Sequence, residues 1–198
     1  MSISIQANIQ NVIDGLEKEK ALSKKVIERT VGDMRTRGPG WVSKAVREEY
    51  NISPKDVKEA CHTEKAGSLS LGGAHVDDVA LVYRGRVLTY THFKMRVNKG
   101  SQPYPISAEV KKGNRRQLHG KSRNTGKPFL AHAGGANTKQ IPFQRETDSR
   151  LPIMALKTVS VPQMVEDGKG NIKPKVEQAI NENLKKRFEH YCEQLLKK

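Results

Sequence analysis

The side chains of this sequence most able to do chemistry are positively charged, and they are concentrated in its middle third. Between Arg84 and Lys127 the chain has twelve Lys and Arg residues but one acidic residue, Glu109, which gives this stretch a net charge of +11. The whole chain has 36 Lys and Arg against 21 Asp and Glu, a net charge of +15. A balance this basic favours a polyanionic partner, either a nucleic acid or an acidic protein surface.

Residues 113–127 are rich in Gly, Asn and basic side chains and have a single Leu. They can bury little apolar surface, so we expect a long, exposed and mobile basic loop. Its cations suit either of two roles, neutralising DNA phosphates or docking on an acidic neighbouring subunit. No aromatic residue lies between Lys111 and Lys127, which argues against stacking on bases. The candidate DNA-facing or docking residues are Lys111, Lys112, Arg115, Arg116, Lys121, Arg123 and Lys127.

Residues for catalysis or metal binding do not form a recognisable pattern. The sequence lacks the nucleophile-elbow, zinc-protease, phosphate-loop and dinucleotide motifs, and its six His residues are scattered. Cys61 and Cys192 lie far apart with no metal-ligand spacing, which indicates two reduced thiols. We therefore expect a protein that is not an enzyme and that has no cofactor and no metal.

The elements that would position the basic residues begin with helices. Apolar residues recur at three- and four-residue steps from Ile5, which predicts an N-terminal helix that breaks or kinks at the Gly-Pro-Gly of residues 38–40. A second helix is expected from Trp41 to about Tyr50. Ser53 then caps a third, short helix that opens at Pro54.

From about Gly67 the apolar pattern shortens to a period of roughly two, typical of strands. Strands are expected near residues 68–71, 81–83, 87–90, 93–97 and 106–112, and a hairpin joins residues 129–133 to 141–145. Residues 151–165 are interrupted by Pro and should be semi-extended. An unbroken apolar stripe then predicts a C-terminal amphipathic helix, which should pack on the sheet or on a neighbouring subunit: Val176, Ile180, Leu184, Phe188, Tyr191 and Leu195.

Helices followed by antiparallel strands and a last helix predict an α+β fold with a central antiparallel sheet and a long basic loop. The expected regions are a helical region 1–66, a β-rich core 67–166 with the basic loop 113–127, and the C-terminal helix 171–198. The apolar stretches are too short to span a membrane. The N-terminus has no signal-peptide pattern, so synthesis in a cytoplasm is expected.

Three segments together resemble the minor tail protein Z family of bacteriophages and prophages. Residues 42–60 contain a segment that resembles the family's R-x-x-Y-N-I/L-x-x-x-D-V-K/R pattern, and residues 106–113 followed by 129–131 resemble its basic strand pair. Residues 150–164, RLPIMALKTVSVPQM, resemble the signature R-L-P-I-x-x-L-x-G-P-S-V-P-Q-M. The sequence departs from that signature at Thr158-Val159, where the family more often has Gly-Pro. The resemblance covers roughly residues 40–166.

The resemblance implies a structural virion protein that completes the tail at its head-proximal end, in the neck, where DNA passes into the tail. It implies a homo-oligomeric ring, hexameric as in the family, that contacts tail-terminator and head-tail connector proteins after assembly in the host cytoplasm. DNA would pass through without being read in sequence. The signature and assembly-contact residues it implies are Leu151, Pro152, Ile153, Leu156, Ser160, Val161, Pro162 and Met164.

A cellular basic protein that binds nucleic acid, for example one associated with ribosomes, is the alternative from another class. The charge fits it equally well. Against it, no recognised nucleic-acid-binding module is evident, and aromatic residues make up only 5% of the chain.

Overall fold

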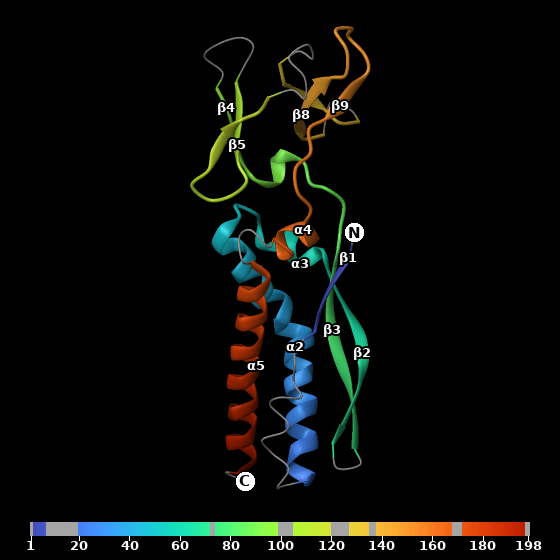
Figure 1. Ribbon diagram of the computed structural model, residues 1–198, viewed down its shortest axis with the longest axis vertical. Helices are drawn as coiled ribbons and strands as arrows, with labels where there is room; N and C mark the ends of the chain where they lie inside the picture. The colour runs from blue at the N-terminus through green and yellow to red at the C-terminus, as the bar shows by residue number, and fades with distance from the viewer. Residues whose placement is uncertain are drawn as a thin grey trace. The chain divides into compact units, whose positions relative to one another are not determined.

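The computed structural model describes residues 2–6, 20–71, 74–98, 105–119, 127–134, 138–167 and 172–196. Long helices at the two ends of the sequence and small antiparallel sheets make it an α+β protein, as the sequence predicted (Figure 1). The chain forms two compact units. Unit 1 comprises Met1–Val46, Val57–Gly85 and Val161–Lys198, and unit 2 comprises Arg47–Asp56 and Arg86–Ser160.

Helix α2 (Lys20–Glu49) continues through Pro39, so the predicted stop at residues 38–40 is wrong, while the kink predicted there as the alternative stays a prediction. Buried side chains on both sides of the Pro, Met34 and Val42, hold the helix against the rest of unit 1. Such packing outweighs the low helix propensity of Gly and Pro. Gly38 also permits a close approach, because a Cβ atom there would lie 2.8 Å from Leu81 Cδ1.

The sheet of unit 1 has the order β1-β3-β2, with β1 (Ser2–Gln6) and β2 (Cys61–Leu71) both antiparallel to β3 (Ala74–Arg84). The prediction that the N-terminus is helical from Ile5 is therefore wrong, since Ile5 pairs with Leu81 in β1. The alternation of Ser and Ile in residues 2–5 is the strand signal. Strand β2 begins at Cys61, earlier than expected. Central strand β3 buries five consecutive residues, 79–83, on both of its faces.

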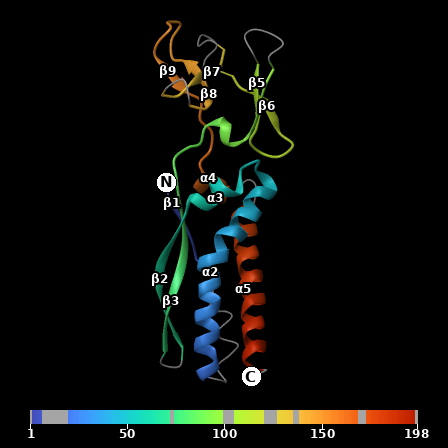
Figure 2. The same cartoon turned by 180° about the vertical axis from the view of Figure 1, so that it is seen from behind.

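Helix α5 (Ile172–Leu196) confirms the predicted C-terminal helix, and its stripe is buried at Val176, Ile180, Leu184 and Phe188. Tyr191 is half-buried, and the side chain of Leu195 lies outside the described part of the structure. The helix runs beside α2 in both views, and polar contacts join the two (Figures 1 and 2). The stripe thus packs on a helix instead of the expected sheet.

Helix α4 (Val161–Val165) corrects the expectation that residues 151–165 are extended throughout. Val161, Met164 and Val165 are buried, since this short helix packs against β3 and α5. The first part of that segment does contain a strand, β9 (Ile153–Ala155).

Unit 2 contains two three-stranded antiparallel sheets. The first, in the order β4-β5-β6, consists of β4 (Lys94–Val97), β5 (Ile106–Glu109) and β6 (Arg115–Gln117). The second, in the order β7-β8-β9, adds β7 (Phe129–His132) and β8 (Gln140–Arg145) and confirms the predicted hairpin. Short helix α3 (Pro54–Glu59) is capped as predicted, because the Asp56 amide donates to Ser53 Oγ at 3.1 Å.

Two further predictions in unit 2 are wrong. Residues 87–90 are not a strand, because the chain there turns into the 3-10 helix η1 (Tyr90–His92). Residues 113–127 do not form one loop, because β6 lies within them and Leu118 is buried after it. Residues 120–126 lie outside the described part of the chain.

Residues 86–160 leave unit 1 after β3 and return to it at α4, and the two ends of this excursion are tied together. The amide of Leu88 donates to the Val159 carbonyl at 3.2 Å, and the amide of Thr158 donates to the Leu88 carbonyl at 2.8 Å. In unit 1, a Cβ on Gly85 would lie 3.7 Å from Pro162 Cδ. The excursion therefore starts and ends at nearly the same place.

Among the described residues, no helix is long and apolar enough to cross a membrane.

Candidate functional site

In the β4-β5-β6 sheet of unit 2, the basic side chains of the middle of the sequence lie on two opposite faces. Residues directly opposite one another in paired strands point to the same face, and successive residues of a strand alternate. The register pairs Lys94 with Glu109 and Glu109 with Arg115, which makes one face polar. The other face has Met95 opposite Ala108 and Ala108 opposite Arg116. That face is apolar except for Arg116, and it packs on a small core of Ile106, Ala108 and Leu118.

Glu109, the acidic residue of the basic stretch, holds the β5–β6 turn in place. One carboxylate oxygen accepts hydrogen bonds from Asn51 Nδ2 at 2.9 Å and from the Gly113 amide at 3.0 Å. The other accepts from Arg115 Nη2 at 3.1 Å. The bond from Gly113 is the main reason that the pKa of Glu109 lies below its ordinary value, with Asn51, Lys94 and Arg115 adding to the effect. The turn needs glycine, because Gly113 has a φ of 74°.

Arg115, one of the predicted DNA-facing or docking residues, is therefore engaged by partners within the protein. Its side chain is 28% exposed, and besides Glu109 it contacts the Lys94 carbonyl and Ser107 Oγ, each at 3.4 Å. Its role is to fix the edge strand β6 to β5.

The other predicted docking cations divide into several groups. Lys111 lies over the ring of Tyr50, with Nζ 5.2 Å from the ring centroid. Lys112 and Lys127 are exposed, as their expected role requires. Lys121 and Arg123 lie outside the described residues.

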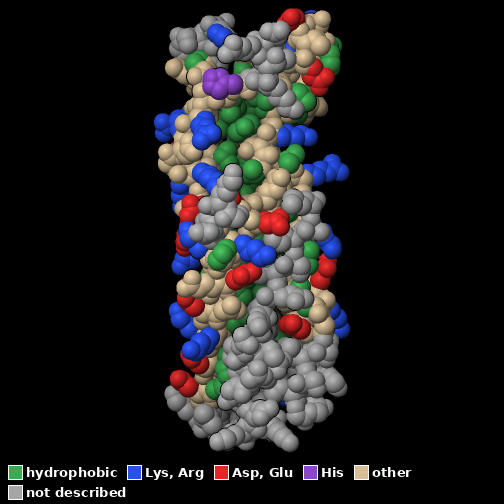
Figure 3. All heavy atoms as spheres, viewed as in Figure 1, with side chains coloured by type: hydrophobic (Ala, Val, Ile, Leu, Met, Phe, Trp, Pro, Cys, Tyr) green, Lys and Arg blue, Asp and Glu red, His purple; other side chains and the backbone are tan. Residues whose placement is uncertain are grey.

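A pocket of about 540 Å³ opens on the apolar face of this sheet. Ala108, Leu118 and Leu156 line it with apolar surface, and the ring of Tyr90 adds an aromatic wall. Lys111, Arg116 and His119 line it with groups that carry or can gain positive charge. None of the lining residues that the structure describes is acidic. In the upper part of Figure 3, which is unit 2, hydrophobic side chains (green) are visible between Lys and Arg side chains (blue).

Tyr90 and His119 are site residues that the sequence did not single out. The absence of aromatics between Lys111 and Lys127 argued against base stacking, but the fold supplies an aromatic ring from outside that segment. Tyr90 reaches the pocket because Thr89 bridges to Lys157, which joins η1 to the strand region near Leu156. An isolated bridge between residues so far apart leaves no local sequence pattern.

The eight signature residues also separate. Ser160, Val161, Pro162 and Met164 are buried inside the subunit, so here they form its core and not the assembly contact implied by the resemblance. Ile153 and Leu156 are half-buried, and Leu156 lines the pocket. Leu151 is 66% exposed and Pro152 is exposed too, joined to it by a cis peptide bond. These two remain available to a neighbour.

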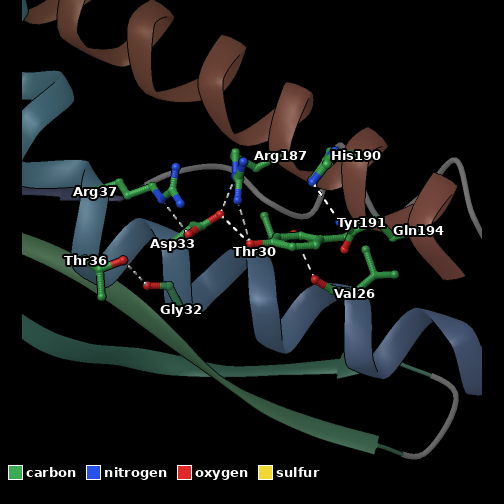
Figure 4. A network of polar contacts seen from close by, with 10 residues as sticks. All are labelled: Val26, Thr30, Gly32, Asp33, Thr36, Arg37, Arg187, His190, Tyr191 and Gln194. Atoms are coloured by element: carbon green, nitrogen blue, oxygen red, sulfur yellow. Dashed lines mark hydrogen bonds and ion pairs between the residues drawn. The ribbon is translucent and has the colours of Figure 1, made fainter.

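A second polar cluster, in unit 1, joins α2 to α5 (Figure 4). Asp33 is 8% exposed and accepts hydrogen bonds from Arg187 Nε and from the Tyr191 hydroxyl, the latter at 2.8 Å. Arg37 Nε lies 3.0 Å from its other oxygen. Burial acts to raise the pKa of Asp33, but the bonds from Arg187 and Tyr191 and the nearby positive charges outweigh burial and lower it. Every polar group of Asp33 is thus satisfied within the subunit, which makes this cluster structural.

Titratable groups elsewhere do not assemble into a metal centre in the parts of the chain that the structure describes. No three His, Cys, Asp or Glu side chains gather there where they could hold a metal ion. His92 pairs with Asp56 at 3.3 Å, and His132 contacts the Thr138 carbonyl and Gln140.

The basic sheet of unit 2, with its pocket, is therefore the candidate functional site. Compared with models of protein families, with curated protein sequences and with solved structures, the chain matches none of them.

Proposed function

We propose that this chain is a structural virion protein of a tailed bacteriophage that completes the head-proximal end of the tail. It would form a ring, hexameric by the family resemblance, between tail-terminator and head-tail connector proteins, with DNA passing through without sequence readout. The proposal rests on the three segments that resemble minor tail protein Z proteins. In the structure, the observation that supports it most is the basic polar face of the β4-β5-β6 sheet.

That face suits contact with a polyanion, because among the described residues the cations on it, Lys94, Arg96 and Arg115, outnumber its one acid, Glu109. Lys94 and Arg96 are exposed on β4, and Lys112 is exposed on the turn between β5 and β6. Glu109, the acidic group on the same face, is already occupied by Arg115 and two amide donors. Contacts of Lys and Arg with phosphates fix position but carry no sequence information, which suits a protein that surrounds passing DNA. Cyclic repetition of the subunit would multiply the charge into a positive collar.

Neutralising this face should weaken duplex DNA binding without unfolding the protein. The test variant changes four exposed cations of unit 2 to Gln, and the matched control changes four exposed cations of unit 1. Arg115 is left intact because it holds Glu109. The test positions are Lys94, Arg96 and Lys112 of this sheet and its turn, together with Lys127 just before β7, and the control positions are Lys44, Lys173, Lys185 and Lys186.

The wild type should bind random-sequence duplex DNA with an affinity that falls steeply with salt. The test variant should show a shallower slope of log affinity against log salt, by about 1 for each phosphate contact removed, while the control keeps the wild-type slope. Fluorescence anisotropy over a salt series measures both. Equal slopes for the two variants, or wild-type binding that does not depend on salt, would reject a DNA-facing role for this face. Docking on an acidic partner would then remain as the function of its charge.

Ring formation is tested separately by sedimentation of the purified chain, alone and mixed with tail-terminator and connector proteins. We expect one discrete closed oligomer in at least one of these mixtures. A chain that stays monomeric in all of them would contradict the proposed tail-completion role. If it bound RNA tightly instead, the alternative of a cellular nucleic-acid-binding protein would be favoured.

A further inference from the structure

We propose that the pocket of unit 2 binds one unpaired nucleotide, with the base against Tyr90 and the phosphate at Arg116. This proposal rests in part on the proposed contact of unit 2 with DNA. It adds a site for a single nucleotide to a sheet whose other face has the exposed cations. At about 540 Å³ the pocket lies within the size range of sites that enclose small ligands. One part of its lining is apolar and aromatic, which suits a base, and another part is cationic, which suits a phosphate.

The apolar part of the lining suits the flat face of a base. Ala108 and Leu118 belong to the small core of the sheet, and Leu156 and Tyr90 pack against that core as half-buried side chains. Because each of these side chains is fixed from behind, the surface they present to the pocket is preorganised. An aromatic ring beside apolar side chains is how proteins commonly stack an unpaired base.

The cationic part of the lining suits a phosphate. Arg116 lies on the otherwise apolar face of the sheet, opposite Ala108. Its Nε donates to Asn114 Oδ1 at 3.1 Å, which orients the guanidinium. The two Nη groups have no acceptor among the described residues and remain for a ligand. His119 lies two residues beyond β6 in the same lining, and Lys111 adds a positive charge held near Tyr50.

The ligand should be an unpaired nucleotide, because a base inside a duplex cannot enter a concave site without leaving its stack. Asn114, Gln117 and Thr158 line the pocket with groups able to hydrogen-bond a sugar or the edge of a base. Two sources share this chemistry, a free mononucleotide and an unpaired nucleotide at the end of a strand. Duplex DNA would instead meet the exposed cations of the polar face.

The first experiment follows backbone amide shifts of the full chain by NMR during titration with adenosine monophosphate, adenosine or inorganic phosphate. Adenosine monophosphate should move the amides of Gln117, Leu118, His119 and Thr158. Adenosine and inorganic phosphate should each bind more weakly, since each satisfies one part of the lining. No shift at these amides with millimolar adenosine monophosphate would overturn the proposal, as would shifts of equal affinity with inorganic phosphate alone.

Two variants with the same charge change test the assignment to the pocket. Arg116→Gln should weaken adenosine monophosphate binding about tenfold or more, as expected for loss of a charged hydrogen bond. Arg96→Gln, on the opposite face of the same sheet, should leave that affinity unchanged. A third variant, Tyr90→Leu, keeps apolar volume but removes the ring, and should weaken adenosine monophosphate more than inorganic phosphate. Equal losses in Arg116→Gln and Arg96→Gln would mean that only general charge matters, which rejects the site.

Competition then identifies the source of the nucleotide. Bound labelled adenosine monophosphate is displaced either by a 5′-phosphorylated single-stranded oligonucleotide or by unlabelled adenosine monophosphate. If the oligonucleotide displaces it at the lower concentration, the site binds a strand end. If the unlabelled nucleotide does, the site binds a free nucleotide. Blunt duplex DNA should not displace either one. Failure of this proposal leaves the salt-dependent duplex binding of the polar face untouched. Failure of the proposed tail function would remove ring assembly but not nucleotide binding.

Discussion

Replacing Phe188 with Ala should lower the free energy of unfolding by about 3–5 kcal/mol. The Phe188 side chain is 6% exposed in the stripe of α5, where it packs with buried residues of unit 1. Truncation removes apolar surface from the core and leaves a cavity that the surrounding side chains can fill only in part. Chemical denaturation at pH 7, followed by circular dichroism, measures the loss.

Lys185→Ala is the control, because Lys185 is exposed on the same helix and should change stability by no more than about 0.5 kcal/mol. If Phe188→Ala unfolds with the wild-type midpoint, α5 does not contribute its stripe to the core of the isolated subunit. The packing described above would then be incorrect.

Replacing Asp33 with Asn should cost about 2 kcal/mol at pH 7, since hydrogen bonds to a charged group contribute roughly 1.5–3 kcal/mol. The carboxylate accepts from Arg187 and Tyr191, and a neutral amide in its place leaves Arg187 without its charged partner. Tyr191→Phe should cost less, because it removes one neutral donor and keeps the ion pair. Urea denaturation of the three proteins ranks the contributions.

The cost of Asp33→Asn should also depend on pH. The native pKa of Asp33 is lowered, so its contribution is fully present above the pKa of the carboxyl in the unfolded chain, near 4. It is lost as pH falls through the still lower native pKa. The stability difference between wild type and Asp33→Asn should therefore be largest at neutral pH and shrink below about pH 4. A difference that stays constant down to about pH 2 would mean that the carboxylate charge does not stabilise the α2–α5 contact.

The parts of the fold with a strong local period could be predicted from the sequence. The stripe of α5, the Ser53 cap of α3 and the hairpin of β7 and β8 all came from residues close together in the chain. The helical state of the Gly-Pro-Gly in α2 could not be predicted in this way, because it depends on packing against Leu81, a residue far away in sequence. Strand β1 was missed because its five residues precede a longer pattern that is helical in period.

The site was predicted in composition but not in geometry. The sequence identified a basic region and the one acid within it, and Glu109 does decide how that region folds. It could not show that Arg115 is tied to Glu109 while Arg116, the next residue, lies on the opposite face with the pocket. That separation follows from the register of β5 and β6, which distant pairing sets. Tyr90 entered the pocket through the same kind of long-range contact.

The junction at which residues 86–160 leave and rejoin unit 1 bears on how such a protein can vary between lineages. Leu88 is hydrogen-bonded to residues 158 and 159, so the two ends of this segment lie next to each other. These hydrogen bonds fix the distance between the ends whatever the length of the chain between them. Doubling the length of a flexible loop between fixed ends adds only about 0.6 kcal/mol of closure entropy. Insertions or deletions in the turns of the segment can therefore be inherited at little cost to β3 and α4, as long as they spare residues 109–112, which also bind residues 49–51. The surface proposed to meet other molecules could then diversify while the helical scaffold stays the same.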